Sequence, residues 1–310
     1  MSGPAPRRAR RVVDGLLLLD KPSGRTSNAA LQRVKWLFQA RKAGHTGSLD
    51  PLASGMLPIC FGEATKFAGY LLDADKTYRV QACFGVRTDT GDADGTVVET
   101  RGLVPILPAE LEQAVASLRG PIQQVPPMYS ALKQQGQRLY AIARAGREVP
   151  REPRPVHIYE FATELFDPVT PVFQVRCSKG TYIRTLIEDL AGRLGTLAHV
   201  TALRRLAVEP FGGQAMITLE EIEAVAGSGP EPVVAALDAL LRPLEAVLPN
   251  WPSVELDTPS ALRVSQGGPV VAPSGLQAGP VRLYAPGLRF LGVGELQTDG
   301  LLAPRRLVAR

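Results

Sequence analysis

GHTGSLDPLASGMLP, residues 44–58, is the densest cluster of turn-forming residues in the chain. The three glycines and one proline within residues 44–55 break both helix and strand patterns, so we expect this stretch to be a loop. Asp50 precedes Pro51, which biases its backbone towards an extended conformation, and the neighbouring glycines let another chain or a ligand approach closely. A carboxylate held in such a loop is a candidate nucleophile or general base, although a lone Asp more often caps a turn.

The segments on either side of this loop show alternating helix and strand patterns. Apolar residues recur at helical spacing or at every second position, and capping residues, glycines and prolines mark the ends. Their irregular order favours an α+β fold over a doubly wound sheet. We expect helices over residues 27–38, 63–72, 107–118 and 183–194, strands over 78–84 and 172–177, and a polar loop over 87–95.

Pro- and Gly-rich segments divide the chain further. The stretch 126–155 is rich in Pro and Arg and shows no continuous core face, which is typical of a long functional or mobile loop. Residues 227–232 form a Gly/Pro break, and short strand patterns from Trp251 onward predict a small β module. The expected organisation is a basic, disordered tail, a main domain and a β-rich module, at residues 1–11, 12–250 and 251–310 respectively.

The composition is that of an ordinary globular protein. The 310 residues are 45% hydrophobic and 21% charged, and no apolar run approaches the ~18 residues of a membrane helix. Three widely spaced cysteines offer neither a CxxC pair nor a disulfide framework, which indicates a reducing, cytoplasmic location. The sequence contains no metal-ligand cluster and no phosphate-binding or dinucleotide motif, so we expect no metal and no cofactor.

The net charge of +5 is unevenly distributed along the chain. Residues 1–50 carry ten Lys or Arg and three acids, and residues 129–206 carry twelve and seven, whereas 51–128 and 207–310 are net acidic. Two basic blocks flanked by acidic ones indicate a face that meets a polyanion, most simply nucleic acid. The alternative is that these charges only solvate the surface.

Three further residues are candidates for a nucleic-acid site. Arg184 lies in the first turn of an expected helix, where a cation opposes the helix dipole by ~0.3–1 kcal/mol. This placement favours an anionic partner nearby, unless the side chain merely covers apolar neighbours at the surface. Tyr78 begins a strand, where its ring either packs in the core or projects into a cleft and stacks on a base. His45 either caps its own loop or stacks on a nucleotide.

Six motifs follow one another along the chain: GLLLLDKPSGRTSN (15–28), AGHTGSLDPLASGMLPICFGEATK (43–66), DKTYRV (75–80), RTDTGDADG (87–95), PPMYSALK (126–133) and CSKGTYIRTLIEDLA (177–191). Over about residues 12–210, their sequences and order closely resemble the bacterial TruB family. Residues 251–310 resemble a small RNA-binding PUA-type module more weakly, and 212–250 are not diagnostic. The resemblance implies a pseudouridine-synthase fold with a mixed, mostly antiparallel central sheet flanked by helices and loops.

The resemblance also implies a function. The family isomerises uridine 55 in the TΨC arm of tRNA to pseudouridine, moving the sugar bond from N1 to C5 of uracil without cofactor or metal. Asp50 matches the catalytic aspartate, Tyr78 the tyrosine that packs on the target ring, and Arg184 the arginine that pairs with the aspartate. His45 matches the histidine that helps hold the flipped T loop. The other active-site positions are occupied by Lys21 and Leu203.

The implied mechanism begins when the target base leaves the folded T loop, at a cost of a few kcal/mol that stacking on an aromatic ring partly offsets. The ionised aspartate then attacks either C1′ of the ribose or C6 of the uracil. The arginine aims the carboxylate and opposes the rise in its pKa when RNA seals the site. The T arm of tRNA is the expected partner, with 126–155 as a mobile RNA contact. We expect a monomer without a protein partner.

Three other functions stay open at this level. A guide-RNA-dependent relative that modifies ribosomal RNA shares the catalytic loop. A tRNA-folding chaperone would bind the same RNA with only incidental catalysis. A glycosidase needs a second acid near Asp50, and nothing in the sequence places Asp92, itself in a loop, at that position.

Overall fold

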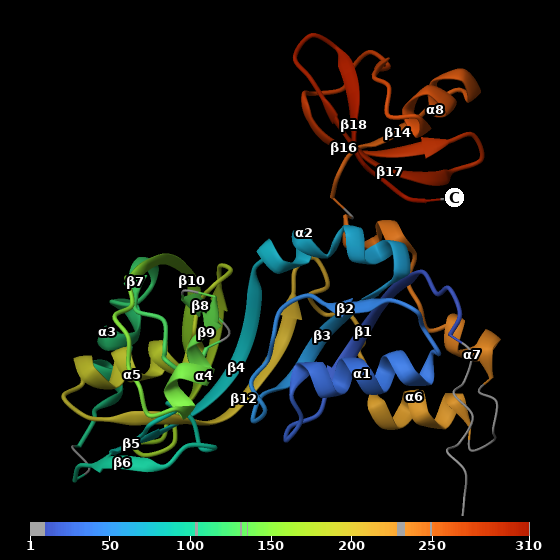
Figure 1. Ribbon diagram of the computed structural model, residues 1–310. Coiled ribbons are helices and arrows are strands. Elements are labelled where there is room, and N and C mark those ends of the chain that lie inside the picture. The colour runs from blue at the N-terminus through green and yellow to red at the C-terminus, as the bar shows by residue number, and fades with distance from the viewer. Residues whose placement is uncertain are drawn as a thin grey trace, which may run out of the picture.

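The computed structural model describes residues 10–102, 105–130, 132–134, 136–227, 233–248 and 250–309. Its strands form a large sheet of nine strands, a second sheet of five strands and two two-stranded ribbons. In Figure 1 the large sheet occupies the lower part of the view and the five-stranded sheet lies above it. The chain therefore has the α+β organisation, with a β-rich C-terminal unit, that the sequence predicts.

The large sheet forms the body of the molecule. Its strands are β1 (Gly15–Lys21), β2 (Ala43–His45), β3 (Ser54–Phe61), β4 (Lys76–Phe84), β7 (Gly120–Gln124), β10 (Arg154–Leu165), β11 (Val172–Cys177), β12 (Ala198–Val208) and β13 (Ile217–Thr218). They follow the order β13-β1-β3-β12-β4-β11-β10-β7, with β2 beside β3. The pairs β1–β13 and β3–β12 are parallel, and the others are antiparallel. The expected mixed, mostly antiparallel sheet is confirmed.

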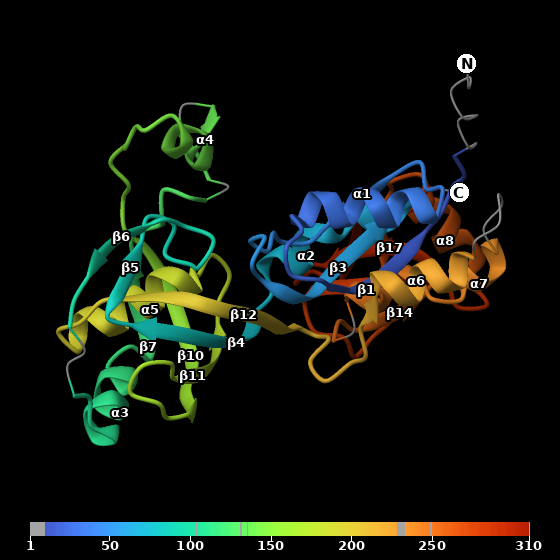
Figure 2. The same cartoon turned by 90° about the horizontal axis from the view of Figure 1, so that it is seen from below.

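Helices share one buried cluster with one face of this sheet. They are α1 (Ser27–Leu37), α3 (Pro108–Ala116), α5 (Ile183–Arg193), α6 (Leu219–Ala226) and α7 (Val234–Asp238). Figure 2 shows α1, α6 and α7 along one half of the sheet and α3 and α5 along the other. Thr26 caps α1 by accepting a hydrogen bond from the Ala29 amide (3.1 Å), and Gly195, at φ +71°, reverses the chain after α5. Both ends agree with the sequence prediction.

The opposite face of β1 and β3 packs towards the C-terminal unit. This unit contains β14 (Ser253–Glu255), α8 (Thr258–Ser265), β15 (Val270–Val271), β16 (Gly279–Ala285), β17 (Arg289–Leu296) and β18 (Leu301–Leu307). Three short helices also contribute to the packing: η1 (Gly62–Lys66), α2 (Ala68–Asp73) and η2 (Leu244–Val247). The rings of Phe67 and Phe290 lie 5.8 Å apart, and Arg306 donates to the carbonyl of Lys66 (2.8 Å). The C-terminal unit is thus attached where β3 ends.

The prediction of a loop over residues 44–58 is wrong at both ends. There the chain pairs as strand β2 or β3, although its local composition favours a turn. His45 of β2 pairs with Ile59 of β3, so the irregular segment between the strands comprises only residues 46–53. Gly55, at φ +100°, belongs to β3. The parallel neighbour β12 passes so closely that a Cβ atom at Gly55 would lie 2.2 Å from the carbonyl oxygen of Arg205.

Short elements account for the other differences from the prediction. The helix expected over 63–72 is divided into η1 and α2, and α8 is a helix where only strands were expected, capped by Asp257 through the Ser260 amide (2.8 Å). The polar loop at 87–95 begins within a strand, and the stretch 126–155 contains secondary structure of its own. These elements are β5 (Val86–Thr88), β6 (Val97–Thr100), β8 (Lys133–Gln134), β9 (Gln137–Arg138) and α4 (Leu139–Arg144).

Residues 1–9, most of the predicted basic tail, lie outside the described residues. Arg11, its last member, is ordered by a bridge to Ala40 and an ion pair with Asp238 (2.6 Å), so the tail ends before this residue. Most of the break expected at 227–232 also lies outside the described residues. None of the helices in the described part of the chain is long and apolar enough to cross a membrane.

Candidate active site

Asp50 lies on the segment 46–53 that joins β2 to β3. Ser27, the first residue of α1, anchors this segment: its hydroxyl accepts from the Leu49 amide (2.7 Å) and donates to the Leu49 carbonyl (3.0 Å). The Ala53 amide closes a turn onto the Asp50 carbonyl (3.1 Å). The backbone around Asp50 is thus fixed on both sides, while its side chain keeps 40% of its surface exposed. A carboxylate presented in this way is positioned to react with a bound molecule.

Arg184 reaches Asp50 from the first turn of α5. Its Nε lies 3.0 Å from Oδ2 of Asp50, and the arginine side chain is only 5% exposed. The two terminal nitrogens donate to backbone carbonyls, Nη1 to Thr90 (2.5 Å) and Nη2 to Tyr129 (2.7 Å). The interpretation of Arg184 as a surface residue is therefore wrong, because protein groups surround the guanidinium and hold it against the carboxylate.

Asp92 is a second acid at this centre that the sequence analysis did not place there. Its Oδ2 lies 3.7 Å from Nε of Arg184, and its Oδ1 accepts from the Thr90 hydroxyl (2.6 Å) and the Asp94 amide (3.2 Å). The only signal in the sequence was the cluster of aspartates in RTDTGDADG. The structure thus places one buried guanidinium between two carboxylates.

The surroundings of Asp50 act on its ionisation in opposite directions. Burial raises the pKa of Asp50 above its ordinary value, and the guanidinium of Arg184 pulls this pKa back down. The carboxylates of Asp92 and Asp94 raise the pKa further, and the ammonium of Lys21 lowers it. Arg184 thus opposes the effect of desolvation on the pKa of this carboxyl group.

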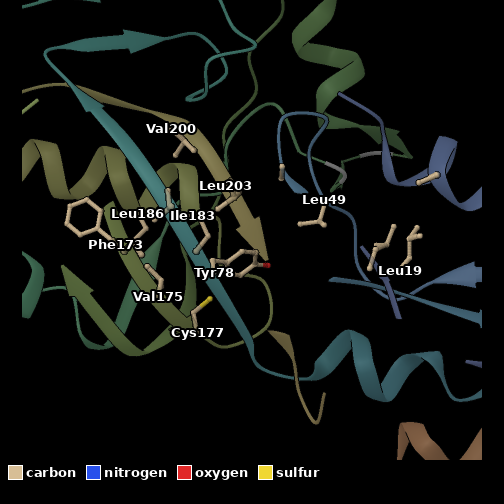
Figure 3. Close-up of a cluster of buried hydrophobic side chains, with 14 of the residues drawn as sticks. Leu19, Leu49, Tyr78, Phe173, Val175, Cys177, Ile183, Leu186, Val200 and Leu203 are labelled. Carbon is tan, nitrogen blue, oxygen red and sulfur yellow. The ribbon is translucent and has the colours of Figure 1, made fainter. Parts of the chain in front are cut away.

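Tyr78 is the third residue of β4 and is 9% exposed. Figure 3 shows its ring beside Ile183 and Leu203, with the hydroxyl group directed away from Phe173. The body of the ring is therefore packed in the core, which is one of the two alternatives that the sequence left open for Tyr78. Its polar end lies close enough to Asp50 for that carboxylate to raise the phenol pKa, although burial is the larger cause of the rise. Tyr78 and Asp50 thus share one site.

Lys21 is completely buried at the end of β1. Its Nζ donates to the carbonyls of Pro22 (2.8 Å) and Arg25 (2.6 Å) and reaches that of Pro51 at 3.4 Å. Burial lowers the pKa of Lys21 to about 8. The ammonium therefore tethers the segment after β1 to the residue that follows Asp50.

His45 and Leu203 lie on strands at the edge of the same centre. His45 ends β2, and its buried Nδ1 has no hydrogen-bond partner among the described residues. Burial and the charge of Arg205 lower the pKa of His45. Leu203, on β12 opposite Val80, helps line a cavity of about 410 Å³ beside the Asp50 segment. All six residues named from the sequence thus occupy one region of the structure.

Three family models together match most of the chain. A family model described as TruB family pseudouridylate synthase (N terminal domain) matches residues 35–183. Two further models, a tRNA pseudouridylate synthase B C-terminal domain and a Pseudouridine synthase II TruB C-terminal domain, match residues 184–249 and 252–308.

Curated relatives match nearly the whole chain. The tRNA pseudouridine synthase B of Ectopseudomonas mendocina is 52% identical over 302 residues, 97% of each chain. That of Stutzerimonas stutzeri is also 52% identical and covers 97% of this chain and 98% of its own.

Solved structures share the fold at lower identity. A protein in an H/ACA RNP bound to a substrate RNA containing 2′-deoxyuridine has a TM-score of 0.71 at 22% identity, covering 96% of this chain and 85% of its own. One in a Cbf5-Nop10-Gar1 complex has a TM-score of 0.69 at 25% identity, covering 91% and 78%. With the family models and the curated relatives spanning almost all of its length, this chain belongs to the TruB family of pseudouridylate synthases.

Proposed function

We propose that this chain isomerises uridine 55 in the TΨC arm of tRNA to pseudouridine, with Asp50 as the nucleophile. The observation that carries the proposal is the ion pair between the partly exposed carboxylate of Asp50 and the buried guanidinium of Arg184. Membership of the TruB family supplies the reaction class, and the curated relatives at 52% identity are named for tRNA.

The reaction breaks the bond between C1′ of the ribose and N1 of uracil and forms a bond between C1′ and C5. The ionised Asp50 attacks C1′ and displaces N1 of uracil, or adds to C6 before the C1′–N1 bond breaks, and the freed uracil rotates within the pocket until C5 faces the sugar. C5 then bonds to C1′, and the bond to the Asp50 oxygen breaks, which regenerates the carboxylate. The proton on C5 then leaves and N1 gains a proton, so that substrate and product are isomers. Arg184 keeps Asp50 ionised and aimed when RNA excludes water from the site.

The uridine reaches this carboxylate only after it leaves the stacked T loop. Such extrusion costs a few kcal/mol, and stacking on an aromatic ring contributes about 1–3 kcal/mol per base in return. Tyr78 supplies the ring and Leu203 an apolar contact beside it, and His45, at the end of β2, is proposed to help hold the T loop. Lys21 holds the neighbouring backbone in place.

The segment 126–155 is proposed as a mobile RNA contact. Figure 2 shows α4 set apart from the body of the molecule. Arg138 and Arg144 lie over the ring of Tyr140, at 5.9 and 5.7 Å from its centroid, which gathers positive charge on this segment. The carbonyl of Tyr129, which binds Arg184, belongs to the same segment. Closure of the segment over RNA would therefore move a group that binds Arg184 of the catalytic ion pair.

We propose the C-terminal unit, residues 251–310, as a second RNA-binding surface.

Charge reversal of Arg138 and Arg144 tests the role of the segment. Each phosphate contact contributes to the salt dependence of binding, so the double variant is expected to bind tRNA more weakly and with a smaller slope against salt concentration. Unchanged binding across a salt series would remove this part of the proposal.

The experiment that tests the function is carbodiimide primer extension on an unmodified tRNA transcript incubated with the pure protein. A stop at position 55 without any guide RNA is expected, and a transcript with cytidine at that position gives none. Asp50→Asn should abolish the stop while tRNA binding persists, which also separates catalysis from RNA chaperoning. Asp167→Asn is the matched control, because Asp167 lies between β10 and β11 and accepts from the amides of Val169 and Thr170 in its own loop. Stops elsewhere, or an active Asp50→Asn variant, would refute the proposal.

A further inference from the structure

Arg205 is the largest fully buried side chain of the described residues, at 1% exposure, and the sequence analysis gave it no role. It lies on β12, one position after Arg204, which instead binds Asp20 through two hydrogen bonds (3.0 and 2.6 Å). None of the ion pairs formed within the described ranges includes Arg205. A guanidinium buried without a carboxylate is costly unless other acceptors surround it.

The groups around Arg205 belong to different parts of the proposed active site. Its Nε donates to the carbonyl of Met56 on β3 (2.7 Å), and its Nη2 donates to the carbonyl of Gly47 in the Asp50 segment (3.2 Å). Arg205 is also in register with Tyr78 on β4, and its charge opposes the rise that burial causes in the pKa of this phenol. One guanidinium thus connects the segment that carries the proposed nucleophile to the residue proposed to hold the base.

The backbone explains how one side chain spans the distance between β3 and β4. β12 lies between β3 and β4, and Arg205 is in register with Gly55 on one side and with Tyr78 on the other. Close approach to β3 is possible because residue 55 has no side chain. The planar fork of arginine donates in several fixed directions, whereas a lysine ammonium at the end of a flexible stem cannot match them.

We propose that Arg205 is a positioning residue of the isomerisation, which sets the distance between the Asp50 carboxylate and the ring of Tyr78. The proposal rests on the function proposed above for these two residues. Arg205 holds the Asp50 segment through the Gly47 carbonyl and is paired in register with Tyr78 across β12 and β4, so one side chain relates the two residues.

The first test measures single-turnover rates, tRNA Kd and thermal stability for Arg205→Lys and Arg205→Met. A misplacement of about 1 Å costs up to about 100-fold in rate, so we expect a roughly 10- to 100-fold slower reaction for Arg205→Lys with little change in tRNA Kd. Arg119→Met is the matched control, since Arg119 also donates to a backbone carbonyl, that of Phe161 (2.9 Å), far from Asp50. A full rate for folded Arg205→Lys would overturn the proposal.

The second test separates positioning from simple stabilisation. If Arg205 acts through the phenol, its replacement costs less in a Tyr78→Phe background than in the wild type, so the two effects are not additive. Additive effects would assign Arg205 a structural role and overturn the proposal. Should neither Arg205 variant fold, Tyr78→Phe alone must lower the rate at unchanged tRNA Kd, and an unchanged rate overturns the proposal. Wild-type protein and Asp50→Asn, assayed in parallel, report on the proposed function independently.

Discussion

Replacement of Arg184 by lysine removes the planar fork from the proposed catalytic centre and keeps its charge. In the wild type, Nε faces Asp50 at 3.0 Å while Nη1 and Nη2 bind the carbonyls of Thr90 and Tyr129 at 2.5 and 2.7 Å. A lysine has one nitrogen, on a shorter reach, and cannot face all three groups at once. Either the carboxylate loses its partner or the two carbonyls lose theirs.

The loss can be given a magnitude. Hydrogen bonds to charged groups contribute about 1.5–3 kcal/mol each. The variant loses two of the three contacts that Arg184 makes, and the lysine ammonium recovers part of their energy. The net loss of interaction free energy is about 2–4 kcal/mol. If this deficit falls on the transition state, the single-turnover rate drops by roughly 30- to 1000-fold. The tRNA Kd should change little, because the nitrogens of Arg184 face protein groups. The assay is release of tritium from C5-labelled uridine in a tRNA transcript, at saturating enzyme.

Arg193→Lys is the matched control on the same helix. Arg193 ends α5 and donates to the hydroxyl of Ser117 (3.0 Å), away from Asp50. Its replacement should leave the rate unchanged. The reasoning fails if Arg184→Lys reacts within a factor of about three of the wild type, since that corresponds to less than 1 kcal/mol. It also fails if the whole defect lies in tRNA binding.

Three further predictions follow from the geometry. Asp92→Asn removes a negative charge that raises the pKa of Asp50, the proposed nucleophile, so the acidic limb of the pH–rate profile should move to lower pH; a shift to higher pH would contradict this. Gly55→Ala should lower the free energy of unfolding by about 2 kcal/mol or more, measured in urea, because of its positive φ and the close β12 backbone, whereas Gly44→Ala, with open space around it, should not. Lys21 and Lys76 both have a pKa lowered to about 8, so the unfolded chain binds more protons between pH 8 and 10 and stability should rise across that interval. Lys21→Met should reduce the rise, and an unchanged slope would refute the assignment.

Local signals were enough to predict some of the regular elements. The cap at Thr26 and the apolar spacing of α5 have causes within a few residues, so both helices were correctly predicted. The ends of the Asp50 loop were wrong because the pairing of His45 with Ile59 depends on the fold. The short helix α4 was hidden by the prolines and arginines around it.

The catalytic centre depended more on family resemblance than on spacing. Asp50 and Arg184 are 134 positions apart, and no periodicity brings them together. Asp92 was correctly seen as a loop residue, but its distance from Arg184 depends on tertiary packing. Arg204 and Arg205 are adjacent and alike in sequence, and only the register of β12, which shifts after Arg205, decides which of them is buried.

Strand β3 has a consequence for the spacing between the two parts of the molecule. One end follows the Asp50 segment, and the other leads into η1, where Lys66 donates to the carbonyl of Leu307 (2.9 Å) in the last strand of the C-terminal unit. Eight residues of extended chain measure about 26 Å, and hydrogen bonds to its neighbouring strands keep β3 extended. The strand therefore fixes the separation between the Asp50 segment and the point where the C-terminal unit is attached.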